Sequence, residues 1–325
     1  MDPFGRQIDY LRISVTDRCD ERCLYCMPEG YRGWARRADH LTADELVRVV
    51  EAATEAGFRK FRLTGGEPLI RKDIVDIARR IWDLTDVQTL GISTNGTHLA
   101  GMAGALKRAG VRSVNISLDS LDPLIYRTLT GGSLDGVLDG IDAALSAGFE
   151  VVKLNCVLLR GVNESQIRPL VDYAAANRLP VRFIELMPLG PGGPLGDRHF
   201  MPVADAMDLL GGRELFRPAT SKPQGHGPAR YYRYQGNGAL VGFIGAVSCE
   251  DFCATCNKLR LTANGKLRPC LGRQGEIDLM PGLRAAGPDD GEVVSAIREA
   301  IANKPENHAF VEGYVSPRPM TAIGG

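Results

Sequence analysis

Short runs of β-branched and aromatic residues alternate with longer amphipathic stretches over the first part of the chain. The runs predict six strands, at residues 10–15, 60–63, 90–93, 113–118, 151–158 and 181–186. The stretches between them have the length and periodicity of helices. This alternation is typical of βαβ units that build a parallel sheet.

Two of the intervening helices have clear end signals. Thr42 is followed three residues later by Glu45, which predicts a capping box, and Gly57 follows as a stop signal. A second helical stretch runs from Ser165 to Asn177. Six βα units are too few for a closed eight-stranded barrel, so the pattern favours an α/β fold with an incomplete (β/α)6 TIM-type barrel. A doubly wound open sheet is the alternative.

The pattern changes after Met187, because residues 188–194 are rich in Pro and Gly and disfavour regular structure. We therefore expect a partial barrel at residues 1–187 and a C-terminal domain at residues 188–325. In this second part the sequence predicts a helix at 203–210, strands at 230–234, 240–247 and 259–262, and a last helix near 292–302.

Composition limits the classes of function. The 325 residues are 44% hydrophobic, enough for a large core without disulfides. Lys plus Arg and Asp plus Glu are both 39, and the resulting zero net charge argues against nucleic-acid or anionic-membrane partners. The N-terminus has no apolar signal-peptide region and no segment is long enough to span a bilayer, so we expect a soluble, cytoplasmic protein.

The cysteines lie in two clusters, apart from the isolated Cys156. The first, Cys19, Cys23 and Cys26, has the spacing C-x3-C-x2-C and follows the first predicted strand. A [4Fe–4S] cube held by three thiolates leaves one iron open to a substrate or cofactor, whereas a structural zinc site normally has four ligands. A zinc site with a distant fourth ligand remains the alternative at this point.

The second cluster, Cys253, Cys256 and Cys270, has the spacing C-x2-C-x13-C. Spacing alone leaves zinc and an iron–sulfur cluster equally open. Cys249, four residues before Cys253, is a candidate fourth ligand for either. If Cys249 ligated iron, no open iron would remain for a substrate.

Tyr25 stands directly before the third cysteine, and the second predicted strand leads into Gly65-Gly66-Glu67-Pro68. The pattern C-x3-C-x-aromatic-C, together with GGEP one strand later, resembles the radical S-adenosylmethionine (SAM) superfamily. This resemblance implies that the first cluster binds and reductively cleaves SAM to a 5′-deoxyadenosyl radical. It also implies that Tyr25 lies beside the adenine and that glycine backbone approaches the methionyl amino group.

Seven segments extend the resemblance to a narrower family: YLRISVTDRC, YCMP, LTGGEPL, STNG, NISLDSL, RFIELMP and FCATCNKLRLTANGKLRPCL. In this order they resemble the GTP 3′,8-cyclases of molybdenum cofactor biosynthesis. The resemblance implies two [4Fe–4S] clusters, the second binding guanine through its open iron. It further implies conversion of GTP into (8S)-3′,8-cyclo-7,8-dihydroguanosine 5′-triphosphate, the first step of molybdopterin precursor synthesis.

Two alternatives stay open. One is another radical SAM enzyme with an auxiliary cluster, such as a peptide-modifying enzyme, and the other is a non-catalytic binding protein stabilised by zinc. The family resemblance implies GTP as substrate, an electron donor such as a flavodoxin or ferredoxin system, and cyclic pyranopterin monophosphate synthase downstream. It is also compatible with a homodimer.

Matching positions imply site residues. The positions for SAM are Tyr25, Gly66, Ser117 and Met187. The positions for GTP are Arg12, Arg62, Ser93, Lys153, Lys258, Leu259 and Arg260. The final Gly324 and Gly325 match a tail that reaches the active site in this family. Three positions depart from the family pattern: Asp20 replaces the usual Asn, Lys258 the usual Arg, and Ser93 the usual Thr.

Overall fold

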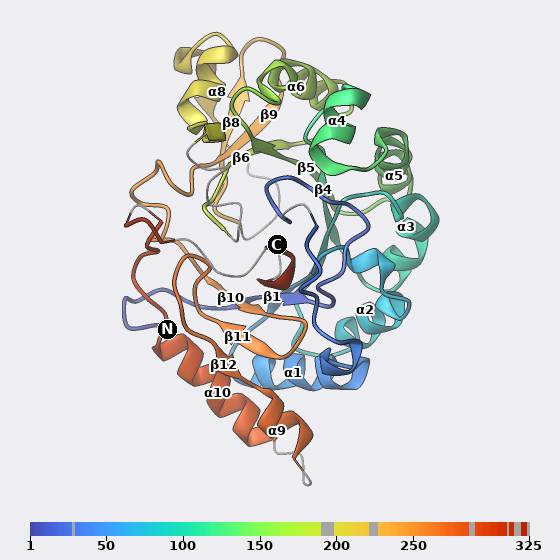
Figure 1. Cartoon of the computed structure of the whole chain (residues 1–325), viewed down its shortest axis with the longest axis vertical. Helices are drawn as coiled ribbons and strands as arrows, with labels where there is room; N and C mark the ends of the chain where they lie inside the picture. The colour runs from blue at the N-terminus through green and yellow to red at the C-terminus, as the bar shows by residue number, and fades with distance from the viewer. Residues whose placement is uncertain are drawn as a thin grey trace.

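A computed structural model describes residues 1–27, 30–189, 198–220, 227–285, 290–310, 312–314 and 320–323. Within them, one twelve-stranded sheet has the order β12-β11-β10-β1-β2-β3-β4-β5-β6-β9-β8-β7. In Figure 1 the sheet curves around the centre of the molecule, and α1 to α6 lie along its outer side. The C-terminal end of the described chain lies near that centre.

The middle of the sheet consists of the six strands predicted from the hydrophobic runs. They are β1 (Tyr10–Ser14), β2 (Lys60–Thr64), β3 (Thr89–Thr94), β4 (Ser113–Ser117), β5 (Val151–Leu158) and β6 (Val181–Glu185). Each differs from its predicted range by at most one residue at either end. Neighbours pair in parallel and follow chain order. A doubly wound sheet reverses its strand order at a switch point, and these six strands show no such reversal.

Helices connect these strands. They are α1 (Ala43–Glu55), α2 (Ile74–Trp82), α3 (Leu99–Arg108), α4 (Pro123–Thr130), α5 (Leu134–Ser146) and α6 (Ile167–Ala176). The predicted capping box is confirmed, since Thr42 and Glu45 exchange both hydrogen bonds. The helix predicted from Ser165 to Asn177 is confirmed as α6, whose N-cap is Gln166, one residue after Ser165. Ser165 lies in a tight 3-10 turn, η3 (Glu164–Gln166), and α6 begins after it.

The C-terminal part of the chain extends the sheet at both edges. Next to β6 lie β9 (Leu240–Ile244), β8 (Arg230–Tyr234) and β7 (Phe216–Pro218), and next to β1 lie β10 (Lys258–Leu261), β11 (Lys266–Arg268) and β12 (Ile277–Asp278). Strand β9 is parallel to β6 and β10 is parallel to β1. The predicted division at residue 187 therefore stays a prediction, while the sheet itself runs through both parts.

Short helices complete the C-terminal part. They are α8 (Val203–Leu209), α9 (Met280–Arg284), α10 (Asp290–Ala302) and α11 (Met320–Ile323), with the 3-10 turn η5 (Arg213–Leu215). Two further 3-10 turns, η1 (Arg37–Asp39) and η2 (Pro68–Ile70), lie in the N-terminal part. The predicted helices at 203–210 and 292–302 correspond to α8 and α10. Most of the Pro- and Gly-rich stretch, residues 190–194, lies outside the described residues.

Side-chain alternation along the central strands separates a core from a polar interior. Ile13 and Leu63 are fully buried in the main hydrophobic cluster. Their neighbours Arg12 and Arg62 instead line a cavity. Because successive strand residues point to opposite faces, one face of the sheet packs on helices and the other carries chemistry.

Candidate active site

One cavity of about 340 Å³ collects almost all the predicted site residues. Every central strand contributes a polar side chain to its wall: Arg12, Arg62, Ser93, Asn115, Lys153 and Arg182, from β1 to β6 in turn. Both cysteine clusters also line this cavity. The two cysteine sites and the strand cations therefore line the same cavity.

The first cysteine site is the loop after β1. Cys19, Cys23 and Cys26 all line the cavity, and the Cys26 amide donates to the Cys23 carbonyl at 3.0 Å. Burial raises the pKa of all three thiols, to about 12 for Cys26. A bound metal centre reverses this effect, because it stabilises the thiolate directly.

Gly66 is required by the packing of the β2 end against this loop. The Gly66 amide donates to the Thr16 carbonyl at 2.8 Å, and the Glu67 amide donates to the Arg18 carbonyl at 2.8 Å. A Cβ atom on Gly66 would lie 2.1 Å from the Arg18 oxygen. Any side chain here would push the start of the cysteine loop away from β2.

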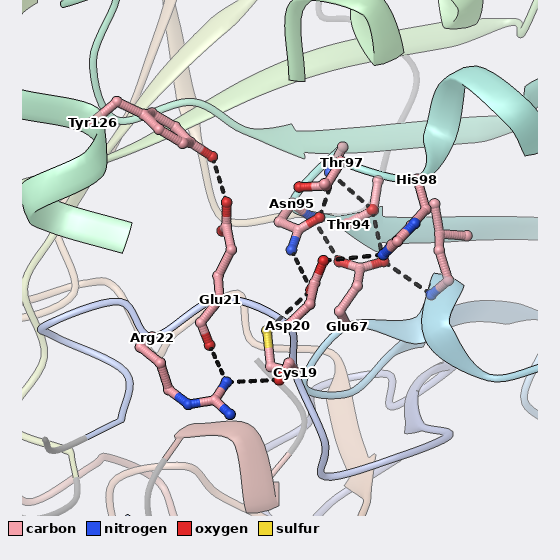
Figure 2. A network of polar contacts seen from close by, with 12 residues as sticks. Cys19, Asp20, Glu21, Arg22, Glu67, Thr94, Asn95, Thr97, His98 and Tyr126 are labelled. Carbon is pink, nitrogen blue, oxygen red and sulfur yellow. Dashed lines mark hydrogen bonds and ion pairs between the residues drawn. The ribbon is translucent and has the colours of Figure 1, made fainter. Parts of the chain in front are cut away.

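The Glu67 carboxylate ties the GGEP turn to the end of β3 (Figure 2). It accepts hydrogen bonds from the Leu69 amide at 2.9 Å, the Thr94 hydroxyl at 2.8 Å and the Asn95 amide at 2.7 Å. Burial raises the pKa of Glu67 to about 8, and these three donors oppose that rise. Glu67 therefore holds the turn in place. The sequence alone did not predict this role.

Further contacts hold the cysteine loop itself (Figure 2). The Asn95 side-chain amide donates to Asp20 at 2.8 Å, and His98 lies 3.1 Å from the second Asp20 oxygen. On the other side of the loop, the Tyr126 hydroxyl donates to the buried Glu21 at 2.7 Å. The loop is thus anchored to β3, α3 and α4 at residues adjacent to Cys19.

The predicted SAM positions Tyr25, Gly66, Ser117 and Met187 all line the cavity. The Tyr25 hydroxyl donates to Asp119 at 2.7 Å, and the other Asp119 oxygen accepts the Val157 amide at 2.8 Å. Sequence reasoning missed Asp119, although the quoted segment NISLDSL contains it. A buried carboxylate directly after a strand was the available signal.

The second cysteine site joins two loops beside β10. Cys253 and Cys256 precede β10, Cys270 follows β11, and all three line the cavity. Although burial raises it, the pKa of the Cys256 thiol is lowered overall by the ammonium groups of Lys304 and Lys258. Among the described residues, no three His, Cys, Asp or Glu side chains converge as they would on a single metal ion. A four-iron cube does not require its thiolates to converge on one atom.

Cys249 is not part of this triad. It does not line the cavity, and it packs against the main hydrophobic cluster. A Cβ atom placed on Gly245 would lie 2.4 Å from the Cys249 sulfur. The candidate fourth ligand therefore faces the backbone at Gly245.

Seven lysine and arginine residues line the cavity: Arg12, Arg62, Lys153, Arg182, Lys258, Arg260 and Lys304. Arg12 of β1 is in register with Arg62 of β2 on one side and with Arg260 of β10 on the other. Burial, and then the Arg260 charge, lower the pKa of Arg12 to about 9. Like charges opposite each other destabilise a sheet, so this face favours a multiply charged anion.

Glycines make room for two of these arginines. Gly91 is in register with Arg62 and Gly242 with Arg182. A Cβ atom on Gly91 would lie 2.6 Å from the Arg62 guanidinium. A Cβ atom on Gly242 would lie 2.9 Å from Arg182 Cγ. Sequence reasoning missed Arg182, although a charged residue in an otherwise hydrophobic strand was a visible signal.

Both arginines are oriented by neutral partners. Arg62 donates to the Tyr10 hydroxyl at 2.6 Å, the Ile92 carbonyl at 2.7 Å and the Ser113 hydroxyl at 2.9 Å. Arg182 donates to the Asn155 side chain at 2.8 Å. These contacts fix the guanidinium planes without cancelling their charges.

Leu259 and the tail residues are the predicted positions that are not found among the residues lining the cavity. The Leu259 side chain is fully buried in the main hydrophobic cluster, so only its backbone can face the site where Lys258 and Arg260 lie. Gly324 and Gly325 lie outside the described residues, and their entry into the site stays a prediction. The preceding Met320 and Thr321 do line the cavity, and the Thr321 backbone hydrogen-bonds Cys26.

Two family descriptions match the chain: the radical SAM superfamily over residues 13–174 and Molybdenum Cofactor Synthesis C over residues 179–310. The GTP 3′,8-cyclase of Pelotomaculum thermopropionicum is 44% identical over 325 residues, covering 100% of this chain and 99% of that protein. GTP 3′,8-cyclase 1 of Pseudomonas aeruginosa is 45% identical over 312 residues, covering 95% and 94%.

Solved structures support the fold. SuiB of Streptococcus suis, bound to S-adenosylmethionine, has a TM-score of 0.62 at 18% identity and covers 90% of this chain and 68% of its own. Methylornithine synthase (PylB) has a TM-score of 0.53 at 17% identity, with coverage of 97% and 85%. These likenesses show an α/β radical SAM fold with a parallel-strand sheet. Among the helices of the described ranges, none is long and apolar enough to cross a membrane.

The substitution Gly242→Ala should weaken binding of inorganic triphosphate several-fold, because its methyl group displaces Arg182. Isothermal titration calorimetry would measure the change. Gly238→Ala is not a fair control, since Gly238 has a positive φ of 77°, whereas Gly101 has open space around it and an ordinary φ. Gly101→Ala should leave affinity unchanged, and equal affinities of both variants and the parent would contradict the steric argument.

Triphosphate binding should also depend on pH through Lys153. Burial, then the charges of Arg182 and Arg62, lower the pKa of Lys153 to about 7. A bound anion raises it, so binding at pH 8 should take up a proton, and affinity should fall by up to about tenfold per pH unit above 7. The free energy of unfolding of the anion-free protein depends on pH in the opposite direction. Between pH 7 and 10.5 the unfolded chain binds more protons at Lys153 than the folded chain, so the stability contributed by this group rises with pH.

Calorimetry in buffers of different ionisation enthalpy measures that proton uptake. Lys153→Met should remove the uptake and flatten the affinity profile between pH 7 and 9. An uptake of the same size in the variant would assign the proton to another group.

Proposed function

Because this chain belongs to the GTP 3′,8-cyclase family of the radical SAM superfamily, we propose that it converts GTP into (8S)-3′,8-cyclo-7,8-dihydroguanosine 5′-triphosphate. The observation that carries the proposal is that two cysteine triads and seven lysine and arginine side chains line one cavity. A nucleoside triphosphate matches this arrangement, with its phosphates on the cations and its base toward the second triad.

The donor sets fit two [4Fe–4S] clusters. Cys19, Cys23 and Cys26 would hold one cluster, and Cys253, Cys256 and Cys270 the other, each with three thiolates and one open iron. The position of Cys249 against Gly245 supports the open iron at the second site. When bound, the clusters and SAM supply one-electron and radical chemistry that side chains lack.

The strand cations bind and orient the substrate. An arginine guanidinium donates hydrogen bonds to two phosphate oxygens at once, which fixes direction as well as charge. Arg12, Arg62 and Arg260 lie on adjacent strands in register and so form a rigid row for the triphosphate, with Lys153 and Ser93 on the same wall. Holding ribose C3′ toward the first triad and guanine C8 within bonding reach lowers the barrier through orientation.

The other end of the cavity is assigned to SAM. Tyr25, Gly66, Ser117 and Met187 contact it in this proposal, and Asp119 holds the Tyr25 ring through its hydroxyl. Buried carboxylates on this side and cations on the other give the two ligands distinct electrostatic environments.

Other parts of the proposal concern architecture and partners. We interpret β1 to β6 as an incomplete six-stranded barrel, with the C-terminal part from residue 188 supplying the second cluster. The reaction needs an electron donor such as a flavodoxin or ferredoxin, and its product is the substrate of cyclic pyranopterin monophosphate synthase. A cationic cavity favours GTP over a peptide substrate, and a triad without Cys249 disfavours the zinc-stabilised binding protein.

Product analysis tests the activity. Anaerobically reconstituted protein with dithionite, SAM and GTP should form 5′-deoxyadenosine and a product with the mass of GTP but a different chromatographic retention. Liquid chromatography with mass spectrometry measures both. Formation of 5′-deoxyadenosine without the GTP isomer would retain the superfamily and reject the cyclase.

Iron analysis tests the role of Cys249. Cys249→Ser should keep about eight irons per reconstituted chain, because its sulfur lies outside the cavity, whereas Cys270→Ser should lower the content toward about four. Elemental analysis gives the iron content and electron paramagnetic resonance gives the cluster type. A loss of iron in Cys249→Ser equal to that in Cys270→Ser would make Cys249 a ligand.

A further inference from the structure

Lys304, just after α10, reaches into the second cysteine site. Its side chain is buried, with 4% of the residue exposed. The ammonium donates to the Lys258 carbonyl at 2.8 Å and to the Pro269 carbonyl at 2.7 Å. Lys258 is two residues after Cys256, and Pro269 directly precedes Cys270. One side chain therefore ties together the two segments that carry these cysteines.

Arg6 holds the chain at Cys253, the third cysteine of the site. Its guanidinium donates to the Cys253 carbonyl at 3.0 Å, and to the carbonyls of Glu306 at 2.7 Å and Pro305 at 2.6 Å. The buried Asp2 pairs with Arg6 at 2.6 Å and keeps it in position. Pro305 and Glu306 directly follow Lys304. Together, Arg6 and Lys304 therefore link the N-terminus and the chain after α10 to the two segments that carry the three cysteines.

We propose that Lys304 and Arg6 are positioning residues that set the spacing of Cys253, Cys256 and Cys270, and that the Lys304 charge stabilises the reduced form of the cluster held there. The proposal rests on the proposed function, in which this triad holds a [4Fe–4S] cluster. Lys304 lines the cavity, but its ammonium is held by the carbonyls of Lys258 and Pro269, so its role is argued from the cysteine segments and not from substrate contact.

The local contacts explain why a cation is needed at residue 304. The ammonium has three donors; two are satisfied by the carbonyls, and the third lies within hydrogen-bonding reach of the Cys256 thiol. Hydrogen bonds to cluster sulfurs and nearby charge both set the reduction potential of an iron–sulfur cluster. A buried positive charge favours the state with one more electron, because the low dielectric weakens screening.

The decisive variant is Lys304→Met, which keeps chain length and removes charge and donors. After anaerobic reconstitution, the second cluster should have a more negative midpoint potential than in the parent chain and should lose iron to a chelator several-fold faster. The first cluster should be unchanged, which shows that the chain is folded. Iron loss is measured with both sites intact. The potential of the second cluster is measured in a separate protein that also carries Cys26→Ala, which disables the first site, by redox titration followed by electron paramagnetic resonance.

Three further proteins complete the test. Arg6→Gln should accelerate iron loss from the second site with a smaller change in potential, and Lys304→Arg should keep the potential near that of the parent. Lys266 of β11 pairs with Asp278, and Lys266→Met is the control for loss of a neighbouring lysine, expected to behave as the parent.

The outcomes separate the two proposals. A parent chain that binds only about four irons would reject the second cluster and with it the proposed function. A parent with about eight irons, together with a Lys304→Met variant of unchanged potential and unchanged iron loss, would overturn the positioning role alone. If Lys304→Met loses both clusters, Arg6→Gln and Lys304→Arg replace it in the test. Iron loss from the second site of Arg6→Gln at the rate of the parent would then overturn the positioning role.

Discussion

The parallel pairing of β1 with β10 is the constraint on which the site depends. It joins a strand near the N-terminus to one about 250 residues later, with Tyr10 opposite Lys258 and Arg12 opposite Arg260. Strand β1 leads into the first cysteine loop, and β10 begins two residues after Cys256. Without this pairing, the two triads would lie on separate parts of the chain with no shared cavity.

The same pairing concentrates positive charge. Arg62, Arg12 and Arg260 stand side by side on three adjacent strands, an arrangement that weakens the anion-free protein. The zero net charge of the chain conceals this local accumulation. Repulsion among these arginines destabilises the protein at the position where an anionic ligand would compensate for it. Functional sites commonly carry such locally unfavourable interactions.

The two triads are held by different kinds of side chain. Around the first, the buried Glu21, Glu67 and Asp119 anchor the loop and the Tyr25 ring. Around the second, Lys304 and Arg6 hold the backbone of the cysteine segments. The first site is therefore held by hydrogen bonds to acidic side chains, and the second by hydrogen bonds from basic ones.

The sequence alone determined the local elements and the chemistry of the donors. The six central strands and the Thr42 capping box follow from periodicity and short-range hydrogen bonding, both of which are encoded within a few residues. Cysteine spacing and the family segments identified both triads and most cations. The helix expected after Ser165 is present as α6, and its N-cap lies one residue later because a 3-10 turn precedes it.

Only the tertiary structure decided the long-range relations. The β1–β10 pairing, the turning of Cys249 toward Gly245, and the reach of Lys304 to the Lys258 and Pro269 carbonyls all join residues whose contact leaves no local pattern. Arg182 and Asp119 were visible as residue types but not as parts of a site. Spacing along the chain specifies which groups are available, and packing of distant strands specifies which groups meet.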